Sequence, residues 1–127
     1  MSNNINIQSF SDFYLYYLTQ HVHPTCRMLH TIGTSLGLAC LIALILTGKW
    51  WFFFLGLLLG YGFAWTGHFF FEKNKPAAFS KPWWSFISDW VMLKDVLTGN
   101  INTKLNAAIE KFGDYISDEA KLAANLN

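Results

Sequence analysis

The fold is decided by residues 28–72, MLHTIGTSLGLACLIALILTGKWWFFFLGLLLGYGFAWTGHFFFE, where Lys49 is the only charged residue before Glu72. The 21 residues between Arg27 and Lys49, and the 22 between Lys49 and Glu72, each approach the ~20 residues that cross a bilayer core as a helix. Only residues 47–49 join the two apolar runs. The sequence therefore predicts that the two runs turn back on each other as a helical hairpin.

The composition also indicates a membrane protein. The chain is 53% hydrophobic and only 13% charged, whereas soluble domains carry about 25% charged residues. We predict an all-α, integral membrane fold with one domain over residues 1–127, whose two main membrane helices span about 25–47 and 50–72. The net charge of +1 and the lack of a basic cluster argue against nucleic-acid binding as the main function.

Flanking helices are predicted on both sides of the hairpin. Residues 9–21 place apolar side chains at spacings of three and four, with Ser9 as a candidate N-cap, so His21 ends an apolar face. Residues 83–97 combine three tryptophans with charged residues, which is typical of a helix at the membrane interface. The segment at about 102–120 has the pattern of a soluble amphipathic helix.

Small residues predict how the two arms pack. The second arm carries a stripe at spacings of four: Gly56, Gly60, Ala64, His68 and Glu72. The first arm carries a matching stripe: His30, Gly33, Gly37 and Cys40. Membrane helices approach closely where small residues line the contact. We therefore expect His30 and His68 to meet across the helix interface, with Glu72 one turn beyond His68.

His21, His30, His68 and Glu72 are thus predicted at one end of the hairpin. A single histidine at a membrane surface usually satisfies one hydrogen bond or anchors at the headgroups. Three at one depth beside a carboxylate point to function, because ionisable groups in or next to a membrane are costly. Neutral imidazoles with a carboxylate form a ligand set for Fe(II) or Zn(II). We interpret these four residues as metal ligands.

Neighbouring polar residues have alternative interpretations. Glu72 can pair with a nearby lysine or with Arg27 instead of a metal. Arg27 can reach lipid phosphates or bind a substrate carboxylate through two hydrogen bonds. We expect His23 to be structural and Cys26 to be a reduced thiol. The sequence leaves open whether either of these two joins the metal site.

The same residues form a pattern that resembles a known family. Its elements are His21-x-x-Pro24, His30-x-x-Gly33 and Gly67-His68-x-x-x-Glu72-x-Asn74-x-Pro76-Ala77, followed by Trp84-Ser85 and Asp89. Over about residues 12–100 they resemble the small membrane family of the yeast 2-hydroxy fatty acid dioxygenase. Bacterial members of that family were long catalogued as a domain of unknown function.

The resemblance implies an Fe(II)-dependent enzyme of fatty acid α-oxidation. Such an enzyme uses dioxygen to shorten a 2-hydroxy fatty acid by one carbon and releases carbon dioxide. The family's histidines correspond to His21, His30 and His68, and its glutamate corresponds to Glu72. The chain is shorter than the fungal enzymes and has fewer apolar segments after the hairpin, so the resemblance does not fix the substrate.

The expected chemistry assigns roles to further residues. A 2-hydroxy acid can bind Fe(II) through its hydroxyl and one carboxylate oxygen, which leaves a position for dioxygen and requires no organic cofactor. We predict that Arg27 or Asn74 binds the second carboxylate oxygen. We also predict that Asp89, without binding the metal itself, orients one of the ligating histidines. The acyl chain is expected in the apolar groove of the hairpin, among the stripe residues and Trp65, Phe69 and Phe70.

Two other function classes remain open, a membrane hydrolase that uses a metal-activated water and a non-catalytic membrane scaffold with structural histidines. A homo-oligomer also remains open. Arg27, Lys73, Lys75 and Lys81 flank the open end of the hairpin, whereas Lys49 alone marks its tip. The excess of basic residues at the open end predicts that both termini are cytoplasmic, in a bacterial inner membrane or in the endoplasmic reticulum of a eukaryote.

Overall fold

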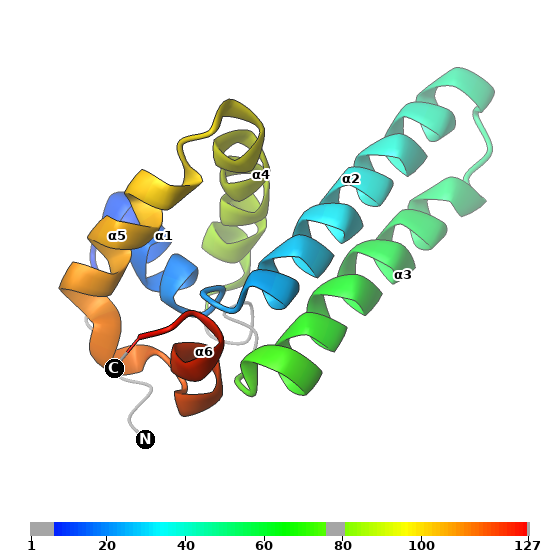
Figure 1. Ribbon diagram of the computed structural model, residues 1–127. Helices are drawn as coiled ribbons and strands as arrows, with labels where there is room; N and C mark the ends of the chain where they lie inside the picture. The colour runs from blue at the N-terminus through cyan, green and yellow to red at the C-terminus, as the bar shows by residue number, and fades with distance from the viewer. Residues whose placement is uncertain (1–6, 76–80, 127) are drawn as a thin grey trace.

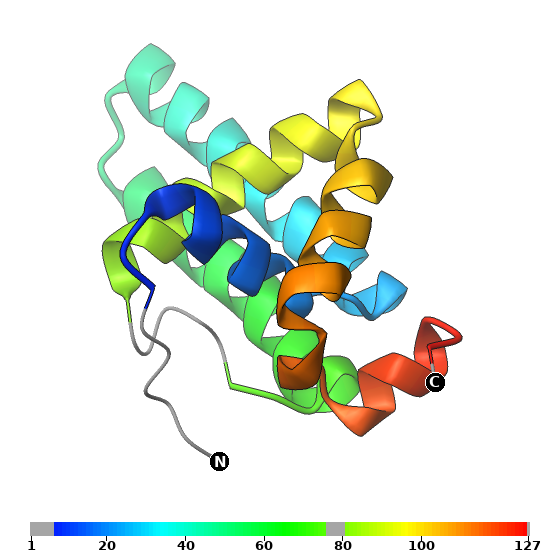
Figure 2. The same ribbon diagram turned by 90° about the vertical axis from the view of Figure 1, so that its left-hand side faces the viewer.

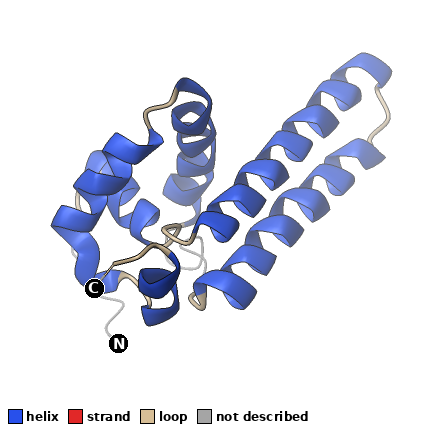
Figure 3. Cartoon of the chain, in the orientation of Figure 1, coloured by secondary structure: helices blue, strands red, loops and turns tan. Residues whose placement is uncertain are grey.

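The computed structural model describes residues 7–75 and 81–126, and these residues form helices, turns and loops without a strand (Figure 3). In chain order the elements are α1 (Phe10–Thr19), α2 (Pro24–Thr47), α3 (Trp51–Thr66), the π-helical turn η1 (Gly67–Glu72), α4 (Pro82–Thr98), α5 (Ile101–Phe112), the 3-10 turn η3 (Gly113–Tyr115) and α6 (Asp118–Ala123). The predicted all-α fold is confirmed. Pro76 and Ala77 of the sequence pattern lie outside the described residues.

The two longest helices form the predicted hairpin. In Figure 1, α2 and α3 run antiparallel and project from a base built by the shorter helices. Pro24 starts α2 in its first turn, where a missing N–H costs nothing. Gly48 ends α2 with a φ of 70°, a left-handed conformation that suits glycine. The turn therefore falls where the sequence predicts it.

The two stripes of small residues face each other, as predicted. A Cβ atom at Gly33 would come within 2.9 Å of the Gly60 carbonyl oxygen, and one at Gly56 would come within 3.1 Å of the Cys40 Cβ atom. Contacts this short leave no room for a side chain at Gly33. The close approach of the two backbones holds the arms together along their length.

Both arms are long and apolar enough to cross a membrane. The candidate spans are Pro24–Thr47 and Trp51–Glu72, and only 22% and 17% of their most apolar windows are buried inside the protein. The core helix of a soluble protein would be mostly buried. Large apolar side chains are instead exposed along the hairpin, including Ile45, Leu46, Trp50, Phe54 and Leu58.

The base has its own hydrophobic core. Phe13 and Leu18 of α1, Met92 of α4, Ala108 of α5 and Ala120 of α6 are all completely buried within it. Figure 2 shows α4 running obliquely across the hairpin, and α1 packs against both α4 and α5. This core fixes α1 and α4 beside the first turns of α2.

The flanking helices largely follow the predicted boundaries. Ser9 caps α1 by accepting a hydrogen bond from the Asp12 N–H at 3.2 Å, and α4 covers the segment predicted at 83–97. The segment predicted as one helix over about 102–120 is instead interrupted between α5 and α6. Gly113 is a poor helix former, and Ser117 starts a new helix by accepting from the Ala120 N–H.

Candidate metal centre

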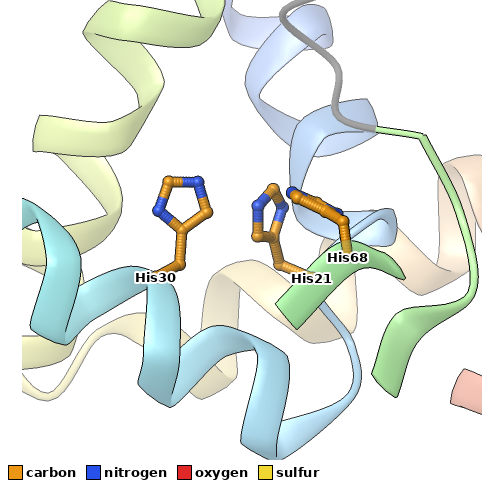
Figure 4. Close-up of side chains that lie close together, drawn as sticks. All are labelled: His21, His30 and His68. Carbon is orange, nitrogen blue, oxygen red and sulfur yellow. The ribbon is translucent and has the colours of Figure 1, made fainter. Parts of the chain in front are cut away.

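Three histidines converge where the hairpin meets the base. His21 lies in the turn after α1, His30 in the second turn of α2 and His68 in η1. Their rings come from three separate segments and lie side by side (Figure 4). One nitrogen from each ring lies within 4.8 Å of the others, and the three side chains are buried. The predicted meeting of His30 and His68, with His21 folded over them, is therefore observed.

The position of His68 depends on an unusual local backbone. Residues Gly67–Glu72 form a π-helical turn, an element frequently found at functional sites. A Cβ atom at Gly67 would lie within 3.1 Å of the Cys26 backbone, so only glycine lets this turn pack against the start of α2. The close packing brings His68 next to His30.

The His21 ring is held in one orientation. Its Nδ1 lies 2.7 Å from the Tyr17 carbonyl oxygen, which can only accept, so Nδ1 carries the proton. Its Nε2 is buried and has no hydrogen-bond partner. Burial, and then the neighbouring His68 and His30 rings, keep the pKa of His21 well below 6.5. The ring is therefore neutral at pH 7 and presents a free lone pair, as a metal ligand must.

The His68 ring is oriented in the same way by a side chain. Its Nδ1 lies 2.8 Å from Asn74 Oδ1. The Asn74 amide group donates to the Gln20 carbonyl oxygen at 3.2 Å and to Gln20 Oε1 at 2.9 Å, which fixes Oδ1 as the acceptor. His68 Nδ1 therefore donates, and Nε2 is left without a proton.

The His30 ring contacts a carboxylate on α4. Its Nε2 lies 3.2 Å from Asp89 Oδ1 and 3.3 Å from the Tyr17 hydroxyl oxygen. The Tyr17 hydroxyl donates to the same Asp89 oxygen at 2.6 Å. Burial, and then the Asp89 carboxylate, raise the pKa of Tyr17 well above 10, so the hydroxyl remains a donor. The contact supports the predicted orienting role of Asp89.

Glu72 lies away from the three imidazoles in this structure. It is completely buried, and its Oε1 accepts from the His23 backbone N–H at 2.9 Å. Cys26 and Arg27 also lie close to the Glu72 carboxylate. Its main-chain oxygen accepts from the Ser117 hydroxyl. Glu72 is not a member of the group of three histidines, so its role as a fourth ligand stays a prediction.

The two residues predicted to bind a substrate carboxylate also face elsewhere. The Arg27 guanidinium donates to the carbonyl oxygens of His21 and Val22 at 2.9 and 3.2 Å, and so holds the corner before α2. Asn74 is occupied by His68 and Gln20. Neither lines the cavity described below. His23 caps α2 by accepting from the Thr25 N–H at 3.1 Å, which agrees with its expected structural role.

An apolar cavity of about 210 Å³ extends from the histidines into the hairpin. A gap that holds one water needs only about 10–15 Å³, so this space is far larger than a packing defect. Its ionisable side chains other than tyrosine are His21, His30, His68 and Asp89. Ser85 also lines it, and its buried hydroxyl has no hydrogen-bond partner. Trp65 contributes to the wall, whereas Phe69 and Phe70, predicted in the groove, do not.

Tyr17 and Gln20 support the histidines, but no such role was predicted for them from the sequence. Tyr17 belongs to the amphipathic pattern of residues 9–21, and its position one turn before His21 places both on the same face. The contact of Gln20 with Asn74 joins positions 54 residues apart, so spacing along the chain does not predict it. Ser85 was noticed only as part of the family pattern.

The donor set fits a divalent transition metal. Three neutral imidazoles lie within reach of one ion, and the unpartnered Nε2 of His21 is a buried polar atom that a metal would satisfy. Backbone or amide oxygens hold two of the rings through their opposite nitrogens, the usual support for metal-bound histidine. The cluster can therefore hold a metal ion.

Comparison with known proteins identifies the family of the chain. The family model described as 2-hydroxy-palmitic acid dioxygenase Mpo1-like matches residues 7–101, which include all three histidines, Asn74 and Asp89. No match was found among curated proteins or among solved structures. Because the family model covers about three quarters of the sequence, the chain belongs to the Mpo1-like family.

Proposed function

We propose that this protein is an Fe(II)-dependent dioxygenase of fatty acid α-oxidation. A 2-hydroxy fatty acid and dioxygen would yield the fatty acid one carbon shorter, carbon dioxide and water. The substrate supplies all four electrons that reduce dioxygen, so the balance needs no further reductant. The observation that carries the proposal is the buried group of three histidines at the polar end of an apolar cavity. Family membership supports the same reaction.

His21, His30 and His68 would hold the iron. When bound, iron would supply the site for dioxygen and for the hydroxy acid, together with the redox chemistry. The chain's own contribution is to keep the imidazoles neutral and correctly turned, through the Tyr17 carbonyl oxygen and Asn74. Asp89 and the Tyr17 hydroxyl restrain the His30 ring from the α4 side.

The substrate head would lie beside α4. Ser85 lines the cavity with a buried hydroxyl that has no partner, and we assign to it the hydrogen bond to the substrate carboxylate. Arg27 would instead stabilise the turn between α1 and α2, because its guanidinium donates to the carbonyl oxygens of His21 and Val22 in that turn. The apolar walls would exclude water from the reacting carbon, which favours a reaction with dioxygen over hydrolysis.

The hairpin would cross a membrane with its metal end near the headgroups. This placement is supported by the low burial of both candidate spans and by tryptophans on α4, of which Trp83 is 78% exposed. A substrate with a polar head and an apolar tail could then enter from the bilayer. The greater number of basic residues at the open end supports cytoplasmic termini.

The test is incubation of iron-loaded protein in detergent with 2-hydroxypalmitate or palmitate under dioxygen, followed by analysis of the products. The hydroxy acid should give pentadecanoate and carbon dioxide, and palmitate should remain unchanged because it lacks the hydroxyl. Three histidines are also the ligand set of zinc enzymes that activate water. Ester hydrolysis without oxygen consumption would favour that alternative, whereas a protein that binds no metal would indicate a scaffold.

A further inference from the structure

The cavity runs along the hairpin and has two chemically different ends. Its imidazoles and Asp89 gather near the first turns of α2 and the start of η1, beside α4. Its other end is purely apolar and lies near the turn of the hairpin. The residues there are Leu41, Leu44, Phe52, Phe53 and Leu57. An occupant that matches both ends has one polar head and one long apolar tail.

Glycines form the floor between these ends. Gly33, Gly37, Gly56 and Gly60 all line the cavity. Gly33 and Gly56 are also needed for close packing of the two arms, because added Cβ atoms would meet neighbours at 2.9 and 3.1 Å. Gly37 and Gly60 are different, since a Cβ atom at either would meet its nearest neighbour only at 3.7 and 3.8 Å. Packing alone does not require glycine at these two positions.

From these observations we infer that Gly37 and Gly60 set the chain length of the substrate by leaving the middle of the cavity open for an extended acyl tail. The inference rests on the proposed function, which places the reacting carbon at the histidines. The tail would then lie in the cavity along the seam where α2 and α3 meet, and point toward the turn of the hairpin.

The length of the cavity gives the expected optimum. From His30 to Leu44 there are 14 residues, or roughly 21 Å of helix at ~1.5 Å per residue. An extended acyl chain advances about 1.25 Å per carbon, given a C–C bond of about 1.5 Å and an angle of about 111°. The cavity therefore accommodates about 16 carbons. Gly37 lies only about 10 Å from His30 on the same scale, so a side chain there would leave room for about eight to ten carbons.

The test compares Gly60→Val and Gly37→Val with Gly62→Val. Gly62 lies on the same helix as Gly60, does not line the cavity, and has nothing within 4 Å of an added Cβ. The milder Gly60→Ala variant adds only a methyl group, at ordinary contact distance from its neighbours. It replaces Gly60→Val in the test if the valine variant does not fold. Two measurements are made in detergent: turnover of 2-hydroxy acids of eight to twenty carbons, and binding of 2-hydroxyhexadecanoate and 2-hydroxydecanoate to metal-free protein.

The unaltered protein should prefer about sixteen carbons, because each buried methylene strengthens binding roughly fourfold. Gly60→Val and Gly37→Val should prefer about ten carbons and bind 2-hydroxyhexadecanoate at least ~10-fold more weakly, with Gly60→Ala intermediate and Gly62→Val unchanged. Identical length profiles in all variants, or an equal shift in Gly62→Val, would overturn the inference. If the binding preference shifts but no hydroxy acid of any length loses a carbon, the cavity assignment stands and the dioxygenase proposal fails.

Discussion

His68 Nδ1 donates a hydrogen bond to Asn74 Oδ1 at 2.8 Å, and Asn74 is itself held by two hydrogen bonds to Gln20. A neutral imidazole carries a single proton, so this bond leaves the His68 Nε2 lone pair free. The loop that follows η1 therefore has a role beyond connecting two helices, because it carries Asn74. It selects the form of His68 that can bind a metal.

Removing the Asn74 side chain should weaken metal binding without unfolding the protein. We expect Asn74→Ala to lower iron affinity by about 10–100-fold, the usual effect of losing a partner behind a metal ligand. Asn74→Asp should restore much of it, because a carboxylate also accepts from Nδ1. The measurement is calorimetric titration of metal-free protein with Fe(II) under anaerobic conditions. Asn100→Ala, at an exposed loop, is the control, and unchanged affinity in Asn74→Ala would contradict the assigned role.

The three histidines should be equally necessary for metal binding. His21→Ala, His30→Ala and His68→Ala should each lose most of the bound iron but keep their helical content, because the glycine contacts still hold the hairpin. His23→Ala should keep its iron and lose only about 1 kcal/mol of stability, since its ring caps α2. Elemental analysis and circular dichroism measure both effects. Full iron content in His68→Ala, or none in His23→Ala, would refute this centre.

The hairpin and the meeting of the histidines could be predicted because they follow from spacing along the chain. Two uncharged runs of membrane length joined by three residues leave only an antiparallel pair, and glycines every three or four residues mark the contacting faces. His30 and His68 then lie at equal depth. In the structure the centroids of the two rings lie 5.8 Å apart.

The position of Glu72 and the hydrogen bonds around the histidines depend on contacts that spacing along the sequence does not predict. An α-helical extrapolation places Glu72 one turn from His68 on the same face, but the π-helical turn changes the angle between successive residues. Glu72 consequently reaches the His23 backbone instead of the imidazoles. The bonds between Asn74 and Gln20, and between Tyr17 and Asp89, link segments far apart in sequence, which only the packed base brings together.

Glu72 can be tested as ligand or anchor with one conservative change. In Glu72→Gln the amide oxygen can still accept from the His23 N–H, so an anchoring role predicts near-normal iron content and stability. Glu72→Ala should lose about 1–3 kcal/mol, because a buried N–H loses its acceptor. Iron content and thermal unfolding are measured for both variants. Loss of iron in Glu72→Gln with normal unfolding would show that the carboxylate is a metal ligand after all.

The glycine contacts predict opposite effects of alanine at two positions in the hairpin. Gly33→Ala would bring a Cβ atom within 2.9 Å of the Gly60 carbonyl oxygen and the Phe63 Cβ, and overpacking of this kind costs about 1–3 kcal/mol. Gly62→Ala meets nothing within 4 Å and should be neutral or stabilising by up to about 1 kcal/mol, because alanine favours the helix. Thermal unfolding in detergent compares the two. Equal melting temperatures would show that the arms do not pack as closely as described.

The basic residues predict the orientation of the hairpin. Arg27, Lys73, Lys75 and Lys81 lie near its open end, and Lys49 alone lies at the tip, so both termini should be cytoplasmic. A reporter that fluoresces only in the cytoplasm should be active when fused to the C-terminus and inactive when inserted after Gly48. Replacing the three lysines by glutamate should weaken this preference, whereas Lys104→Glu in α5, far from the candidate spans in sequence, should not. Activity of the Gly48 insertion alone would place the termini, and the metal centre with them, on the opposite side of the membrane.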